Sequence, residues 1–205
     1  HGVISIGHNH SHWKSSISKQ LDTLSFYSNA IKNPLQEILA KKLAERSGYS
    51  NYELFMCNSG AEANENAIKL ASFHTGRKKI ISFKGAFHGR TSGAVMLTDN
   101  PSIQAPFNHT DNVIMLPLND TQALEDALDK NDVAGIIIEG IQGVGGLSEP
   151  SPEFLKKAVS LCRDHGTLII LDEVQSGFGR SGHFFAHQHI CNEADIISMA
   201  KGMGN

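Results

Sequence analysis

A carboxylate that stands directly after an apolar run is the first candidate for chemistry in this sequence. Asp172 follows 168–171, four apolar residues typical of a buried strand. Because a charge at the end of a buried strand is costly unless it is paired, Asp172 needs a partner. An arginine or a helix N-terminus would serve, and so would a cationic group of a bound ligand. The residue alone leaves both interpretations open.

A run of small residues at 58–61 precedes a predicted helix over 61–75. Ser59 can cap this helix, and Glu62 stands three residues later, as in a capping box. The free N–H groups at such a helix start can hold a phosphate. A well-capped helix without any ligand has the same pattern, so the run predicts either a phosphate site or an ordinary cap.

Three more candidates follow other apolar runs. Glu139 precedes a glycine-rich segment, 140–146, which either lets a ligand approach the backbone closely or makes a tight loop. Phe87 could cover a flat ring, and Arg90 could clamp a carboxylate in bidentate fashion. Taken alone, a Phe is more often explained by packing and an Arg by a surface charge.

The elements that would position these residues alternate along the chain. Strands are expected over 53–57, 79–83, 113–118, 133–139, 167–174 and 195–199, and helices over 61–75, 121–130 and 152–166. Strands separated by helices indicate an α/β fold with a mostly parallel sheet flanked by helices. Ligands bind beyond the carboxyl ends of the strands in such sheets, and every candidate above follows a predicted strand.

Composition argues against several other classes of protein. The 205 residues carry a net charge of −3, and the only basic cluster is Arg77–Lys79, so no nucleic-acid partner is expected. Three cysteines without close spacing argue against a disulfide framework, and alternating histidines at 8, 10 and 12 lack companion ligands, so no metal site is expected. Without a signal peptide or a membrane-spanning apolar run, we expect a cytoplasmic protein with no membrane contact.

One glycine motif is a competing signal. Gly177–Gly182 matches the G-x-G-x-x-G pattern of dinucleotide-binding loops and follows a predicted strand. That fingerprint needs a helix to open there and an acidic residue further on. Residues 183–188 have no helical period, and Asp172 and Glu173 precede the glycines. A nucleotide-binding module is therefore kept only as an alternative.

Five motifs occur in a fixed order, and together they resemble one family. They are Asn58-Ser-Gly-Ala-Glu-Ala-Asn-Glu65, Ala86-Phe-His-Gly-Arg-Thr91, Ile138-Glu-Gly-Ile-Gln-Gly143, Leu171-Asp-Glu-Val-Gln-Ser-Gly-Phe-Gly-Arg-Ser-Gly182 and Ala200-Lys-Gly202. The sequence resembles the class III (subgroup II) aminotransferases, which are pyridoxal-phosphate (PLP) enzymes of fold type I, and within them the acetylornithine branch. The resemblance spans essentially the whole chain. The presence of both Asp172 and Lys201 argues against a non-catalytic relative.

The resemblance assigns a role to each candidate. It implies that Lys201 carries PLP and that Asp172 pairs with the pyridinium nitrogen, which keeps the ring an electron sink. The remaining residues implied to bind the cofactor are Ser59, Gly60 and Ala61 at the phosphate, Phe87 on the ring, Gln175 near the phenolic oxygen, and Glu173 and Val174 beside them. Arg90 would hold the substrate α-carboxylate, and Glu139 would lie near the substrate.

The implied reaction moves the terminal amine of N-acetylornithine to 2-oxoglutarate, giving N-acetylglutamate semialdehyde and glutamate, a step of arginine biosynthesis. N-succinylornithine, ornithine and 4-aminobutyrate are alternative amino donors. The family also implies a homodimer. Residues 1–25 would belong to the N-terminal segment, and 26–205 to the N-terminal portion of the large PLP-binding domain.

Two departures from the family pattern stand out. Val144 occupies a position where family members often carry a glutamate, which is expected to help switch between the two substrates. The sequence also holds only four residues after Lys201, without the family's C-terminal domain. We therefore expect these 205 residues alone to bind PLP poorly and to turn over slowly or not at all.

Overall fold

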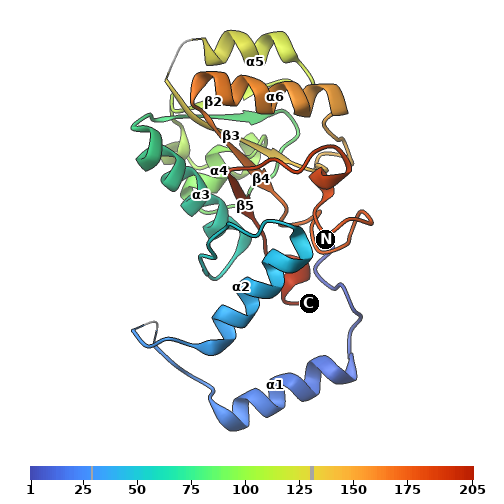
Figure 1. The fold of residues 1–205 in the computed structure, drawn as a ribbon. Helices are drawn as coiled ribbons and strands as arrows, with labels where there is room; N and C mark the ends of the chain where they lie inside the picture. Colours follow the sequence, from blue (N-terminus) through green and yellow to red (C-terminus); the bar gives the residue numbers. More distant parts are fainter. Residues whose placement is uncertain (29, 130–131) are drawn as a thin grey trace.

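The computed structural model describes residues 1–28, 30–129 and 132–205. Five parallel strands form one sheet in the order β2-β1-β3-β4-β5. The strands are β1 (Lys79–Phe83), β2 (Val113–Leu116), β3 (Val133–Glu139), β4 (Leu168–Asp172) and β5 (Ile196–Ser198). Helices cover both faces of this sheet, so the predicted α/β architecture is confirmed (Figure 1).

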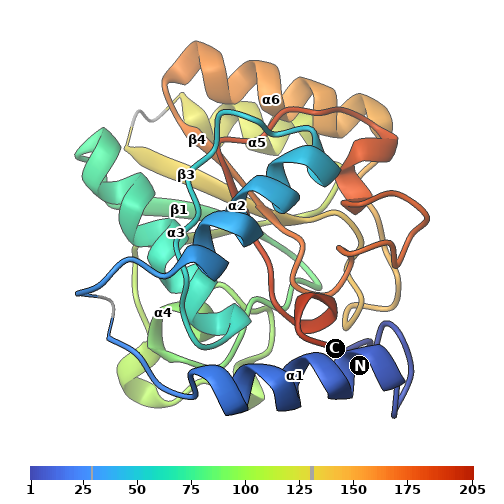
Figure 2. The same ribbon diagram turned by 60° about the horizontal axis from the view of Figure 1, so that its bottom comes forward.

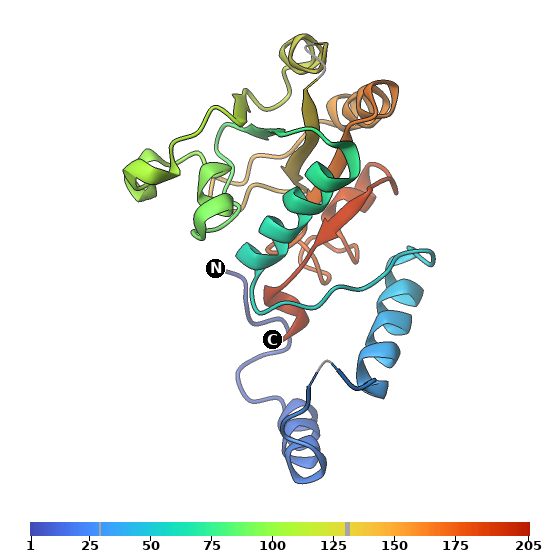
Figure 3. The same ribbon diagram turned by 90° about the vertical axis from the view of Figure 1, so that its left-hand side faces the viewer.

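The helices divide between the two faces and an outlying N-terminal part. They are α1 (Ser11–Thr23), α2 (Pro34–Ser47), α3 (Gly60–Thr75), α4 (Ser92–Met96), α5 (Thr121–Leu128) and α6 (Pro152–His165), with 3-10 turns η1 (Pro101–Ile103), η2 (Pro106–Asn108), η3 (Ala186–His189) and η4 (Lys201–Met203). Figure 3 shows α3 on one side of the sheet and α5 with α6 on the other. Figure 2 shows α1 set apart from the sheet, and none of its residues is buried.

Successive side chains of a strand point to opposite faces of the sheet, and this explains why helices pack on both faces. In β3, Ile136 and Ile138 pack toward α5 and α6, while Ile137 between them packs toward α3. All three are at most 1% exposed. Burying each such side chain contributes about 1.5–3 kcal/mol, which is why a continuous apolar run suits a strand covered on both faces.

The strand register brings the chemical candidates together. Glu139, the last residue of β3, pairs with Asp172, the last residue of β4, and Asp172 pairs with Ser198 at the end of β5. These three strands therefore end level with one another. The segments that follow them all begin at one edge of the sheet, as expected for a ligand-binding edge.

Several strands and helices are shorter in the structure than the sequence predicted. The expected strand 167–174 ends at Asp172, because the Asp172 carboxylate accepts a hydrogen bond from the Val174 N–H at 3.0 Å and turns the backbone. Strands 113–118 and 195–199 are likewise shorter. The helix expected over 121–130 begins after its Asp120 cap and ends at Leu128, and Lys130 lies outside the described residues.

The expected strand at 53–57 was wrong. This segment has no regular secondary structure and pairs with no strand among the residues that the structure describes. An apolar groove of about 830 Å³ is lined by this segment, by β5 and by α2 and α3. Phe55 is 70% exposed, so this side chain is not covered as it would be in a buried strand of the sheet.

The dinucleotide alternative also fails on local structure. Turns and bends, and no α-helix, follow the glycines of Gly177–Gly182 before η3, and Phe178 itself has a positive φ of 59°. The phosphate-binding helix start that the fingerprint requires is therefore missing from this part of the described chain. No helix in the described ranges is long and apolar enough to cross a membrane.

Candidate active site

A cavity of about 620 Å³ lies at the carboxyl edge of the sheet. It is lined by the start of α3, the loop after β1, the end of β3, the turn after β4 and the start of η4. Nearly all predicted site residues meet here: Gly60, Ala61, Phe87, Arg90, Glu139, Asp172, Val174, Gln175 and Lys201, together with Val144. Residues that are more than 140 positions apart in the sequence, such as Gly60 and Lys201, thus line the same cavity.

Asp172 is 3% exposed and is held by three hydrogen-bond donors. Its Oδ2 accepts from Asn64 Nδ2 at 2.7 Å and bonds to His88 Nδ1 at 2.7 Å, while Oδ1 accepts from the Val174 N–H. A carboxylate that only accepts is stable when buried with this many donors. The bonds therefore fix an anion in one orientation at the cavity wall.

His88 and Asn64 were not among the residues predicted from the sequence. The His88 side chain is fully buried, and its Nε2 has no hydrogen-bond partner among the described residues. Asn64 also donates to the His88 carbonyl at 2.8 Å, and its Oδ1 accepts from the Ser198 hydroxyl. The available signal was position: His88 stands between the two candidates Phe87 and Arg90, and Asn64 lies one helical turn after Gly60.

The start of α3 offers unpaired amides to the cavity. Gly60 and Ala61 are the first residues of the helix, whose opening N–H groups have no intrahelical partner. A Cβ at Gly60 would lie 2.6 Å from Val174 Cγ1, and one at Gly89 would lie 2.6 Å from Ala61 Cβ. Both positions therefore require glycine, because the loops after β1 and β4 press closely against this helix start.

Lys201 is half-buried at the beginning of η4, three residues after β5 ends. It lines the cavity and also the apolar groove beside β5. Gln175, on the turn after β4, donates from its Nε2 to the His1 carbonyl at 2.9 Å. Arg90 is exposed at the cavity mouth, where a charged substrate group can reach it.

Two predicted residues do not face this cavity. The Ser59 hydroxyl accepts from the Glu62 N–H at 3.1 Å, as a helix cap, and Ser59 lines the neighbouring apolar groove. Glu173 is fully buried and points away from Asp172, toward Ser176 and His187. The alternation of side chains at the end of a strand explains why adjacent Asp172 and Glu173 face opposite sides.

Glu139 is 5% exposed, and burial raises the pKa of its carboxyl to about 7. The nearby Asp172 charge also raises this pKa, whereas His88 and the N–H groups of Phe87 and Gly143 lower it. Phe87 N donates to Glu139 Oε1 at 2.9 Å. Glu139 is therefore poised to change charge near neutral pH, at the cavity wall.

Glu139→Gln should raise the free energy of unfolding above that of the native protein by more at pH 8 than at pH 5. The native Glu139 binds its proton more tightly folded than unfolded, so its contribution is intact below pH 4.5 and is lost as the pH rises through about 7. At 1.36 kcal/mol per unit, that loss is about 3 kcal/mol. Urea unfolding at pH 5 and pH 8 measures it. The exposed control Glu149→Gln should leave the pH profile as it is, and an unchanged profile for Glu139→Gln would show that this carboxyl does not titrate there.

Comparison with known sequences identifies the family. The family described as "Aminotransferase class-III" matches residues 1–205. The acetylornithine aminotransferase of Lactococcus lactis subsp. lactis is 43% identical over 205 residues, covering 100% of this chain and 53% of that protein. The acetylornithine aminotransferase of Archaeoglobus fulgidus is 42% identical over 204 residues, covering 99% and 54%. The chain thus spans about half the length of the curated relatives it matches.

Solved structures agree with this placement. Ornithine aminotransferase from Toxoplasma gondii ME49 has a TM-score of 0.88 at 30% identity, covering 98% of this chain and 49% of that one. Taurine:2-oxoglutarate aminotransferase from Bifidobacterium kashiwanohense, solved in complex with PLP and glutamate, has a TM-score of 0.86 at 29% identity, covering 96% and 50%. The shared fold, the whole-length family match and a cavity that unites the five motifs agree: this chain belongs to the class III aminotransferases, which are PLP enzymes.

Proposed function

We propose that the protein transfers the terminal amine of N2-acetylornithine to 2-oxoglutarate, giving N-acetylglutamate semialdehyde and glutamate. The observation that carries this proposal is the cavity where Asp172 and Lys201 face the start of α3. The acetylornithine aminotransferases at about 40% identity support the choice of substrate. In this reaction a primary amine becomes an aldehyde while a 2-oxo acid becomes an amino acid, so nitrogen and hydrogen balance between the two half-reactions.

The residues of the cavity fit PLP in their chemistry. The amides of Gly60 and Ala61 suit a phosphate at a positively polarised helix start. Asp172, fixed as an anion, suits a protonated ring nitrogen, and Phe87 offers a ring face. The buried His88 Nε2, without a partner among the described residues, adds an unused polar atom at the same wall. When bound, PLP supplies an electron-withdrawing ring that makes the C–H beside the substrate nitrogen acidic.

The chain's own residues would attach the cofactor, move the proton and orient the substrate. Lys201 would hold the cofactor covalently through Nζ and, once released by the amino substrate, would move the proton at the carbon that bears the nitrogen. Arg90 would orient the substrate through its carboxylate, in the bidentate geometry that guanidinium groups favour. Gln175 would donate to the phenolic oxygen of the cofactor. Glu139 would lie beside the substrate, where its raised pKa lets it be neutral or charged.

We further propose a cytoplasmic homodimer. The three free cysteines fit a reducing compartment. Large apolar side chains support a subunit contact, because Phe26 and Phe73 are 83% and 77% exposed. Sedimentation of the intact protein tests the dimer, and a monomer at micromolar concentration would contradict it.

The substrate choice is tested with a panel of amino donors. N-acetylornithine, N-succinylornithine, ornithine and 4-aminobutyrate would each be offered to the intact protein with 2-oxoglutarate, and glutamate formation would be followed. We expect the highest kcat/KM for N-acetylornithine. A higher value for an unacylated donor would move the assignment to another ω-amine, while no glutamate from any donor would contradict the proposed reaction itself.

Val144→Glu should weaken the use of 2-oxoglutarate relative to the amino donor. Val144 lines the cavity and is 53% exposed, so a carboxylate there would face incoming substrates. It would repel the 2-oxoglutarate dianion more than zwitterionic N-acetylornithine. We expect the ratio of the two kcat/KM values to shift by roughly three- to tenfold. Val144→Gln, which adds the same bulk without charge, is the control, and an equal shift in both variants would contradict the electrostatic explanation.

A further inference from the structure

A buried chain of hydrogen bonds lies behind the cavity, on the side of β4 that faces away from it. Glu173, next to Asp172, is 0% exposed. Its Oε2 accepts from the Ser176 hydroxyl at 2.7 Å and from the Ala186 N–H at 3.0 Å. Its Oε1 accepts from the His187 N–H at 2.9 Å and bonds to His187 Nδ1 at 2.8 Å. His187 Nε2 in turn lies 2.7 Å from the Tyr49 hydroxyl.

The partners fix the direction of the bonds at Glu173, because a carboxylate only accepts. The two backbone amides can only donate to Glu173, and an ionised carboxylate offers room for about four donors. The pattern is therefore completed by an Nδ1–H on His187 and a donating Ser176 hydroxyl. When the His187 ring carries a single proton, on Nδ1, its Nε2 accepts from the Tyr49 O–H. Burial raises the pKa of Tyr49, which agrees with a hydroxyl that keeps its proton and donates.

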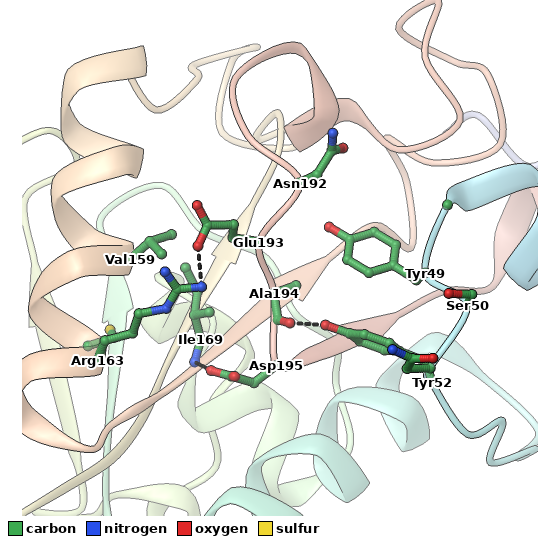
Figure 4. Close-up of a pocket in the computed structure, with 13 residues that line it drawn as sticks. Tyr49, Ser50, Tyr52, Val159, Arg163, Ile169, Asn192, Glu193, Ala194 and Asp195 are labelled. Atoms are coloured by element: carbon green, nitrogen blue, oxygen red, sulfur yellow. Dashed lines mark hydrogen bonds and ion pairs between the residues drawn. The ribbon is translucent and has the colours of Figure 1, made fainter.

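The order carboxylate, imidazole, hydroxyl would also suit a nucleophile, but the surroundings of Tyr49 argue for a structural use. Figure 4 shows Tyr49 on the wall of a cavity of about 230 Å³ that also includes Asn192 and Ala194. Polar groups there already bond one another: the Arg163 side chain pairs with Glu193, and the Tyr52 hydroxyl donates to the backbone carbonyl of Ala194. The charged pair and the Tyr52 hydroxyl beside Tyr49 are thus engaged in bonds of their own, which favours a structural use of Tyr49.

The chain of bonds ties two segments to the turn that carries the cofactor-binding residues. Glu173 belongs to that turn, His187 to η3, and Tyr49 follows the end of α2. A second bond runs in parallel, because Gln188 Nε2 donates to the Ser47 carbonyl at 2.7 Å. The His187 ring is stacked on Phe185, with ring centroids 5.7 Å apart. A displacement of Glu173 must therefore move Asp172 on one side of it and Gln175 on the other.

We propose that Glu173, His187 and Tyr49 form a positioning relay that holds the turn 172–175 in the conformation needed to bind PLP. None of the three touches the cofactor cavity through its side chain, so they act through Asp172 and Gln175. The inference rests on the proposed function, in that PLP is the ligand whose binding reports the geometry of the turn. It also replaces the expectation that Glu173 contacts the cofactor directly.

The test is PLP titration of the intact protein, followed by the visible absorption of the bound cofactor. Glu173→Gln puts an amide NH2 in place of one carboxylate oxygen, against one of the two backbone N–H groups that donate there, so it should weaken PLP binding at least tenfold and shift the absorption maximum. His187→Leu should have a similar effect, and His187→Asn, which restores a donor near Nδ1, should recover most of the affinity. Tyr49→Phe, which removes only the terminal hydroxyl and keeps the ring, should weaken binding two- to fivefold and should fold even if Glu173→Gln does not.

A matched control separates positioning from general loss of stability. Leu155→Ala opens the core beneath α6, away from the turn, and should lower Tm at least as much while leaving PLP affinity within twofold. Equal losses of affinity in Leu155→Ala and the relay variants, or native affinity in Tyr49→Phe and His187→Leu, would overturn the relay. Failure of the native protein to bind PLP would instead overturn the proposed function.

Discussion

Replacing Lys201 by alanine should abolish transamination, with kcat falling by at least about 10⁴-fold. The proposed role of Lys201 combines covalent attachment of the cofactor with proton transfer at the reacting carbon, and no neighbouring lysine lines this cavity in the described chain. Steady-state glutamate formation measures the loss. PLP can still enter the cavity of the variant, because the amides at Gly60 and the Asp172 carboxylate remain, so the visible band of the attached cofactor should vanish while some affinity persists.

Two controls define what Lys201 contributes. Lys201→Arg keeps the positive charge but cannot form the covalent attachment, and it should be as inactive as Lys201→Ala. Lys69→Ala removes a lysine that lines only the apolar groove, and it should keep at least half of the native rate. Retained turnover in Lys201→Arg would mean that charge, and not covalent attachment, is what the site requires.

Asp172→Asn should lower kcat by a hundredfold or more, roughly the loss seen when a single well-oriented electrostatic group is removed from an active site. The substitution is nearly isosteric, and His88 and Asn64 can keep partners there. What is lost is the fixed anion that would keep the ring nitrogen protonated. The kinetic loss should therefore be much larger than the change in Tm.

Asp172→Ala adds a structural cost to the kinetic one. It leaves the buried Asn64 amide and His88 ring without their acceptor, at about 1–3 kcal/mol for each unsatisfied group. Glu193→Gln, which removes an exposed carboxylate paired with Arg163, should change neither rate nor stability measurably. A rate for Asp172→Asn within threefold of the native value would exclude a role for this charge in the reaction.

Much of the fold followed from patterns that the sequence displays locally. The run in β3 and the capped helix α3 were predicted with near-correct bounds, because burial on both faces and a Ser59 cap each leave a direct signature. The strand at 53–57 was wrong because a strand requires a neighbour, which no local pattern reports. Helices α1 and α2 were not predicted.

The sequence was enough to name most of the residues that line the candidate site, but not to say which way each side chain turns or what it contacts. Strand ends in a parallel sheet share one edge, so the sequence pattern alone was enough to place Glu139 and Asp172 together. The face toward which a residue turns depends on where the strand stops. This is why Glu173 was assigned to the cavity, although of the adjacent pair Asp172 and Glu173 only Asp172 lines it. His88 was overlooked because its role depends on a carboxylate 84 residues later in the chain.

The attachment point of the cofactor on the chain is the most direct test of the role given to Lys201. The intact protein would be loaded with PLP, reduced with borohydride, digested and analysed by mass spectrometry. We expect the cofactor mass on the peptide containing Lys201 and on no other lysine, and we expect the visible absorption band to disappear on reduction. Cofactor attached to a different lysine, or absent from every peptide of a protein that transaminates, would contradict the assignment of Lys201.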